Sequence, residues 1–134
     1  MASGGLPSRQ RMREWARAAL LEDAQVTLRI VGAREGRQLN RSFRGRDYAT
    51  NVLTFSYSGM RPLYGDIVLC APVVAREARA QRKPLAAHYA HLIVHGMLHL
   101  QGFDHESDKD AEAMEAREAE IVAKLGYADP YGGR

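Results

Sequence analysis

All five histidines of this 134-residue chain lie between residues 88 and 105. The stretch HGMLHLQGFDH, residues 95 to 105, has histidines at its first, fifth and last positions. Residues four apart stand one turn apart on a helix, so His95 and His99 can both reach one ion through a ring nitrogen. Gly102 lets the backbone turn back and brings His105 toward the same point. Three neutral imidazoles leave one position open, which is typical of a catalytic zinc site.

This histidine spacing matches that of zinc metallopeptidases, but Gly96 stands where those enzymes have their glutamate general base. A glycine inside a helix costs about 1 kcal/mol relative to alanine, so we expect a reason such as close approach of a strand or a substrate. A zinc ion alone lowers the pKa of its water ligand to about 7, so hydrolysis remains possible without the glutamate. Protonation of an amine leaving group becomes the difficult step, which disfavours peptide hydrolysis.

Phosphodiester hydrolysis suits the remaining groups better, because an ion can polarise a phosphoryl oxygen while an arginine neutralises the growing charge. Arg44 and Arg46, in the loop RGRDYAT, are the candidate arginines, although a loop arginine taken alone is more often merely solvated. The first 50 residues carry ten arginines and five acids, in a chain of net charge +3. This asymmetry is a weak indicator of nucleic-acid binding, and an ordinary solvated basic face is the simpler interpretation.

Other residues near the motif have more ordinary interpretations. His88 and His91 share a helical face with His95, and we interpret them as buried histidines with a partner. The alternative is that they face the cleft, where they would contact the metal ligands or the substrate. Asp104 is expected to orient a ligand histidine or to stabilise the turn. The single cysteine, Cys70, is interpreted as a small buried hydrophobe, and no internal disulfide is possible.

Eight elements are expected to position these residues. Helices are predicted within residues 6–21, 34–45, 71–81, 83–102 and 107–126, and strands within residues 25–32, 51–57 and 64–70. This order predicts an α+β fold: a small mixed β-sheet covered by about five helices, with the zinc site on a central helix and the turn after it.

Caps and apolar spacing set the predicted helix boundaries and faces. The expected boundary residues are Ser8 and Ser107 as N-caps, Pro84 at a first helical position, and Gly45, Gly102 and Gly126 at helix ends. The first helix is expected to bury Met12, Trp15, Ala16, Ala19 and Leu20 on one face. The second is expected to be anchored by Leu39 and Phe43.

Length and composition predict a single domain spanning residues 1–134. Apolar residues make up 46% and charged residues 26%, which is typical of a folded globular protein. No apolar run is long enough for a membrane helix, and the start MASGGLPSRQRMRE lacks the apolar stretch of a signal peptide. We therefore expect a cytoplasmic protein with no membrane partner.

Four segments resemble the YbeY family of bacterial endoribonucleases and ribosomal RNA maturation factors. They are HGMLHLQGFDH (95–105), LNRSFRGRDYATNVLTF (39–55), GDIVLC (65–70) and LGYADPY (125–131), and the resemblance extends from about residue 6 to residue 131. It implies that His95, His99 and His105 hold one zinc ion, with His95 and Arg44 in the catalytic site. It also implies that Arg44 faces the metal across a basic groove that accepts RNA, with Arg46 as a further candidate contact.

The resemblance further implies a biological role and partners. The implied activity is metal-dependent cleavage of single-stranded RNA in 3′-end maturation of 16S rRNA and in late quality control of the small ribosomal subunit. The implied partners are ribosomal RNA, the small subunit and an Era-type GTPase, but not DNA. A zinc metallopeptidase-like hydrolase and a non-catalytic ribosome-assembly factor with a structural zinc remain as alternatives.

The chain departs from this family at its start. Members normally have a strand before the first helix, whereas here only MASGGL precedes PSRQRMREW. We therefore expect this chain to lack that strand, which would leave one edge of the sheet unpaired.

Overall fold

The computed structural model describes residues 5–57, 62–104 and 106–132. These residues form five helices and three strands, joined by loops. In chain order they are α1 (Arg9–Ala18), β1 (Ala24–Val31), α2 (Ala33–Arg44), β2 (Val52–Ser56), β3 (Leu63–Cys70), α3 (Ala71–Ala80), α4 (Leu85–Leu100) and α5 (Asp108–Lys124). The predicted order of helices and strands is confirmed, and so is the α+β fold with a small mixed sheet.

The central strand of the sheet is β3, which has β1 on one side and β2 on the other. It pairs parallel with β1 and antiparallel with β2, where Thr54 lies opposite Ile67. Because successive side chains of a strand point to opposite faces, Ile67 and Leu69 enter one core while Val68 and Cys70 enter another. The sheet therefore buries apolar side chains on both faces, and Cys70 is buried as predicted.

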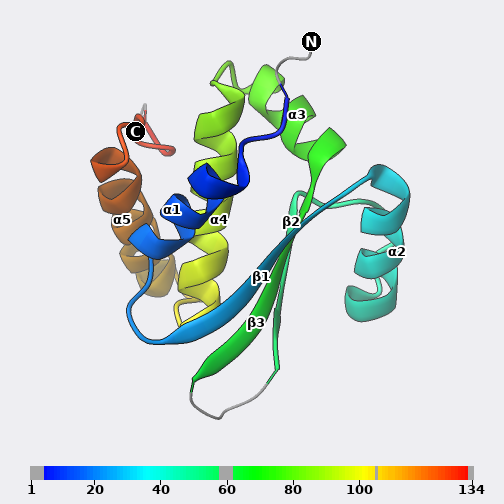
Figure 1. The fold of residues 1–134 in the computed structure, drawn as a ribbon, viewed down its shortest axis with the longest axis horizontal. Coiled ribbons are helices and arrows are strands. Elements are labelled where there is room, and N and C mark those ends of the chain that lie inside the picture. The colour runs from blue at the N-terminus through cyan, green and yellow to red at the C-terminus, as the bar shows by residue number, and fades with distance from the viewer. Residues whose placement is uncertain (1–4, 58–61, 105, 133–134) are drawn as a thin grey trace.

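The central helix is α4, which packs against α1, α3, α5 and the sheet. Figure 1 shows α1, α4 and α5 grouped on one side of the sheet, with α2 on the other. Buried residues occur nearly all round α4, as expected for a helix enclosed by other elements. This helix carries His88, His91, His95 and His99, so its neighbours decide what each histidine meets.

Local signals place most helix ends where they were predicted. The hydroxyls of Ser8 and Ser107 each accept a hydrogen bond, at 3.1 Å, from the backbone N–H three residues later. The three helix-ending glycines all have positive φ: Gly45, Gly102 and Gly126. Pro84 directly precedes α4 instead of occupying its first position.

Two apolar residues predicted to be buried are instead exposed. Leu20 is 41% exposed because α1 ends at Ala18, so the helical face does not continue to it. Phe43 is 66% exposed, and its ring packs edge-on against Phe55 with centroids 5.1 Å apart. The prediction that Phe43 anchors α2 was wrong, because β2 is a flanking strand and covers one side of the ring. Leu39, one turn earlier, packs against the second core as expected.

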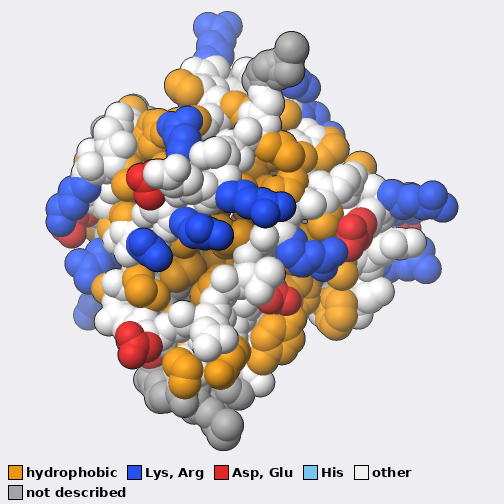
Figure 2. Space-filling view, viewed as in Figure 1, with side chains coloured by type: hydrophobic (Ala, Val, Ile, Leu, Met, Phe, Trp, Pro, Cys, Tyr) orange, Lys and Arg blue, Asp and Glu red, His pale blue; other side chains and the backbone are white. Residues whose placement is uncertain are grey.

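The basic residues of the N-terminal half lie largely on the surface. Figure 2 shows Lys and Arg side chains spread over the face that α1 and β1 form. Arg9, Arg13 and Arg17 of α1 are all exposed, which agrees with the interpretation of a solvated basic face. Within the described ranges, no helix is long and apolar enough to cross a membrane.

Candidate active site

A cavity of about 460 Å³ opens between α2, β2 and α4. Its walls are Phe43 and Arg44 at the end of α2, residues 52–55 of β2, and His95 and His99 of α4. The fold thus gathers a candidate arginine and two candidate metal ligands from distant parts of the sequence. Arg46 is exposed in the loop after α2 and does not line this cavity.

The two histidines on α4 reach the cavity from successive turns of the helix. The side chain of His95 is 26% exposed, and His99 is more exposed still. The third predicted ligand, His105, lies outside the described residues. Within the described ranges, no group of three or more His, Cys, Asp or Glu side chains is placed to hold a metal ion. The described part of the chain therefore contains two of the three predicted ligands.

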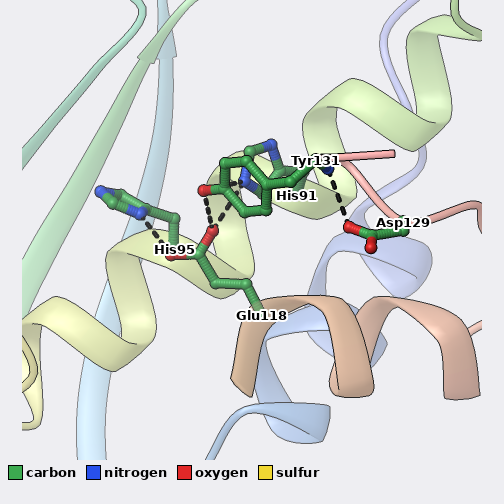
Figure 3. Close-up of polar contacts among 5 residues, drawn as sticks. All are labelled: His91, His95, Glu118, Asp129 and Tyr131. Atoms are coloured by element: carbon green, nitrogen blue, oxygen red, sulfur yellow. Dashed lines mark hydrogen bonds and ion pairs between the residues drawn. The ribbon is translucent and has the colours of Figure 1, made fainter. Parts of the chain in front are cut away.

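A buried carboxylate from α5 stands behind His95. Glu118 has no exposed surface, and its Oε2 lies 2.7 Å from Nδ1 of His95. Its Oε1 lies 2.7 Å from Nε2 of His91 and also accepts a hydrogen bond from the hydroxyl of Tyr131. Figure 3 shows the carboxylate between the two histidine rings, with the tyrosine reaching it from the segment after α5.

The electrostatics of Glu118 fix how His95 can bind a metal. Burial alone would raise the pKa of Glu118, but hydrogen bonds from His91, His95 and Tyr131 outweigh it and bring the pKa to about 2. The carboxylate is therefore ionised at neutral pH and acts only as an acceptor. Nδ1 of His95 must then carry the proton, so Nε2 is the nitrogen whose lone pair can bind a metal. Imidazole nitrogens suit a zinc ion, and histidine ligands of zinc commonly have a carboxylate partner such as Glu118.

The remaining histidines of α4 differ in their surroundings. His88 is 3% exposed, and its Nε2 lies 2.8 Å from Oε1 of Glu77, so it is a buried histidine with a partner, as predicted. His91 instead shares Glu118 with His95. His91 therefore also has a buried partner, as predicted. The alternative interpretation required it to face the cavity, but it is not among the residues that line the cavity.

The loop that follows Arg44 is held to α2 by side-chain contacts at two adjacent loop residues, Asp47 and Tyr48. Asn40 is buried, and its Nδ2 donates to the backbone oxygen of Tyr48 at 2.7 Å. Asp47 accepts two hydrogen bonds from Arg37, at 2.8 and 3.0 Å. The end of α2 is thereby fixed relative to the loop, with Arg44 at the cavity.

The turn after α4 contains Asp104. Its Oδ1 accepts a weak hydrogen bond, at 3.3 Å, from the backbone N–H of Glu106. This contact agrees with the predicted role of Asp104 in stabilising the turn.

Gly96 faces the sheet and not the cavity. A Cβ atom at this position would lie 3.1 and 3.2 Å from atoms of Ile67 and 3.3 Å from Thr54. The expected close approach of a strand is therefore confirmed. A glutamate at position 96 would point into packed side chains, so this chain has no room for the general base of a metallopeptidase there.

The contact between Glu118 and His95 was not predicted from the sequence, although a signal for it existed. Glu118 lies on the helical face that also buries Met114, Ile121 and Val122. A charged residue within an apolar stripe requires a buried partner, because an unpaired buried charge is costly. The partner itself could not be named without knowing that α5 packs on α4.

Comparisons with known proteins agree with these observations. The chain matches the family model "Endoribonuclease YbeY" over residues 8–126. It is 61% identical over 131 residues to an Endoribonuclease YbeY from Cupriavidus necator, covering 96% of this chain and 66% of that protein. A protein of the same name from Nitrosomonas eutropha is 62% identical over 126 residues, covering 94% of this chain and 89% of the relative.

A solved structure shares the fold. The solution structure of TM1509 from Thermotoga maritima superposes with a TM-score of 0.57 at 29% sequence identity. The match covers 94% of this chain and 89% of that one. The overall fold of this chain is therefore similar to one already determined by experiment.

Proposed function

The chain belongs to the YbeY endoribonuclease family, and we propose that it is a zinc-dependent endoribonuclease that cuts single-stranded RNA. The observation that carries this proposal is the meeting of Arg44, His95 and His99 around one cavity. The activity named in the relatives supplies the reaction class. The residues of the cavity supply groups suited to a phosphodiester.

His95, His99 and His105 are the residues that would hold one zinc ion. When bound, such an ion polarises a phosphoryl oxygen and makes water a nucleophile at neutral pH. His95 can bind the ion only through a ring nitrogen that carries no proton. Because Nδ1 donates its proton to a hydrogen bond with Glu118, the free lone pair is on Nε2. Neutral ligands preserve the positive charge that the reaction requires.

Arg44 is the residue that would bind the phosphate. Its guanidinium carries forked donors that match two oxygens of one phosphate, and it stays charged at any physiological pH. In the transition state the phosphate gains negative charge, which a positioned cation stabilises. Arg46, farther along the loop, would contact the RNA backbone outside the cavity.

The Arg44→Ala variant tests this assignment. We expect its kcat on single-stranded RNA to fall by about 100-fold or more, by analogy with removal of one transition-state donor. The matched control, Arg46→Ala, removes the same charge two residues away and should change mainly KM. A proposal that places Arg44 at the reacting phosphate fails if the two variants have equal kcat values.

The two alternatives are tested with substrates and with metal-site variants. Incubation with an unstructured polypeptide and with single-stranded RNA separates the hydrolases, and cleavage of the polypeptide alone would favour the peptidase. A structural role for zinc predicts that folded His99→Ala and Arg44→Ala proteins still support rRNA processing. The endoribonuclease proposal predicts that both variants fail to do so.

The proposal extends to the setting in which the activity is used. We assign the chain to 3′-end maturation of 16S rRNA and to late small-subunit quality control in the cytoplasm, with an Era-type GTPase as a partner. The resemblance carries this assignment. Accumulation of 3′-extended 16S rRNA in cells that lack the protein would support it, and normal 3′ ends would contradict it.

A further inference from the structure

We propose that Glu118 is a positioning residue for the metal site, and that through it the C-terminal segment controls how His95 presents Nε2. This inference rests on the proposed function, because it takes His95 as a metal ligand. Glu118 does not touch the cavity. Its action is on the ring of His95, whose Nδ1 lies 2.7 Å from its Oε2.

The geometry leaves the ring of His95 little choice of orientation or tautomer. A carboxylate can only accept a hydrogen bond, so it selects the form of His95 that has its proton on Nδ1. Figure 3 shows the opposite side of the ring pointing away from Glu118, and His95 is one of the residues that line the cavity. The same contact therefore sets both the direction and the availability of the coordinating nitrogen.

The carboxylate is itself held by two further groups. His91 on α4 and Tyr131 after α5 both contact Oε1, so Glu118 cannot rotate without losing them. Tyr131 is fixed in turn, because its backbone N–H donates to Oδ1 of Asp129 at 2.8 Å. The network thus runs from the C-terminal segment through Glu118 to a metal ligand.

A second histidine–glutamate pair on the same helix provides a matched control. Nε2 of His88 lies 2.8 Å from Oε1 of Glu77, nearly the distance found at Glu118. Neither residue lines the cavity. Glu77→Gln and Glu118→Gln therefore each remove a carboxylate that contacts a histidine of α4, but only Glu118 contacts a proposed ligand. Glu77 is 31% exposed and Glu118 is fully buried, so the comparison is made on zinc binding and not on stability.

The experiment measures zinc affinity by competition with a chelator, together with the visible spectrum of the cobalt(II)-substituted protein. Glu118→Gln should weaken zinc binding by about 10- to 100-fold and change the cobalt spectrum, because an amide can donate to Nδ1 and favour the wrong tautomer. Glu77→Gln should leave both unchanged. Equal effects of the two variants, or no effect of Glu118→Gln, would overturn the inference.

A milder variant decides the matter if Glu118→Gln does not fold. Tyr131→Phe removes one hydrogen bond to the carboxylate and keeps the ring. It should weaken zinc binding several-fold in a protein that still folds cooperatively, with a modest loss of stability from the missing hydrogen bond. Unchanged zinc affinity would overturn the inference. Failure of the proposed function has a different signature: wild-type protein that binds no zinc, or zinc binding that His95→Ala does not affect.

An independent observation concerns the exposed ring of Phe43, and from it we infer a nucleobase-stacking site. This second inference also rests on the proposed function. Phe43 directly precedes Arg44, lines the same cavity and is 66% exposed. Phe55 holds it from one side, edge to face at an interplanar angle of 72°.

This position suits a base of the bound RNA strand. Exposed aromatic rings beside a phosphate-binding cation are the usual platform for single-stranded nucleic acid, because every base has a π face. A base in a duplex is already stacked and paired, so its transfer to Phe43 would require unpairing. Phe43 would therefore favour single-stranded substrates.

Binding of a single-stranded oligonucleotide to variants of Phe43 tests this inference. Phe43→Leu keeps an apolar contact but loses the π face, and should weaken binding by roughly 5- to 100-fold. Phe43→Trp should restore binding, and its fluorescence should change when RNA is added. Tyr64→Ala, which removes another exposed aromatic outside the cavity, is the control and should bind normally.

The outcomes separate this inference from the proposed function. Wild-type affinity in Phe43→Leu, an equal loss in Tyr64→Ala, or unchanged fluorescence of Phe43→Trp at saturating RNA would overturn the stacking site. The single native tryptophan, Trp15, is 3% exposed, so the wild-type protein serves as the fluorescence blank. A wild-type protein that binds no RNA would instead contradict the proposed function.

Discussion

His88 and His95 occupy the same helix, but their surroundings act on them differently. His95 is partly exposed at the cavity, whereas His88 is buried beside Glu77. Burial lowers the pKa of His88 from its ordinary value of 6.5, and the hydrogen bond with Glu77 opposes this only in part. The folded protein therefore favours neutral His88.

This shift predicts a loss of stability on acidification. Below pH 6.5 the unfolded chain binds a proton at position 88 that the folded protein resists, so the free energy of unfolding falls as the pH drops. Above that pH the contribution is fully present. The free energy of unfolding can be measured in urea between pH 5 and 7.5. With decreasing pH it should fall less steeply for His88→Gln than for the wild type, by up to about 1.4 kcal/mol per pH unit. Equal slopes for the two proteins would contradict this prediction.

The pair of His95 and His99 could be predicted from the sequence, whereas the pair of His95 and Glu118 could not. The spacing of His95 and His99 was sufficient to predict that they share one site, because helix geometry fixes their separation. Glu118 lies 23 residues beyond His95, and only the packing of α5 on α4 brings them together. No local pattern encodes such a pairing.

At the scale of elements, the contact between α4 and the sheet depends on a missing side chain. Gly96 allows the helix to approach Ile67 and Thr54 so closely that even a methyl group would be tight. This close approach also sets the positions of His95 and His99 relative to β2. The glycine that replaces the peptidase glutamate thus has a packing role.

The Gly96→Glu variant tests this packing. Steric overlap and burial of a carboxylate should lower the free energy of unfolding by at least about 3 kcal/mol. The control is Gly32→Glu, where a Cβ atom would meet nothing within 4 Å. Because Gly32 is the N-cap of α2, this variant should lose only about 1 kcal/mol, the usual cost of a poor cap residue. Denaturant unfolding of both variants gives the comparison. A Gly96→Glu protein as stable as Gly32→Glu would show that α4 does not need this close approach.

Elements were predicted well where their ends carry local signals. Ser8, Ser107 and the helix-ending glycines determine backbone geometry within a few residues, so they are readable from sequence. Burial of Phe43 was predicted wrongly because helical spacing identifies a face but not how far the neighbouring sheet extends. Its exposure depends on β2 being a flanking strand, which is a property of the fold.

For the whole molecule, metal binding should couple to stability. Two of the proposed ligands lie on α4, and His105 lies between α4 and α5 in the sequence, so an ion would link these parts of the chain. Free zinc at about 100 times its Kd should add about 2.7 kcal/mol to the free energy of unfolding. The melting temperature of the wild-type protein should rise by several degrees.

Two controls accompany this thermal measurement. His99→Ala should lose most of the zinc-dependent shift, and magnesium should give little shift with wild type because it prefers oxygen ligands. An equal zinc shift in His99→Ala would show that the ion binds elsewhere.

The decisive measurement for a catalytic metal site is the rate at which zinc-loaded wild-type protein and His99→Ala cleave single-stranded RNA. His99 is exposed, so its removal should leave the fold intact, which circular dichroism can verify. We predict cleavage by the wild type and a loss of at least about 100-fold in the variant. Equal rates for the two folded proteins would contradict a catalytic metal site at the cavity.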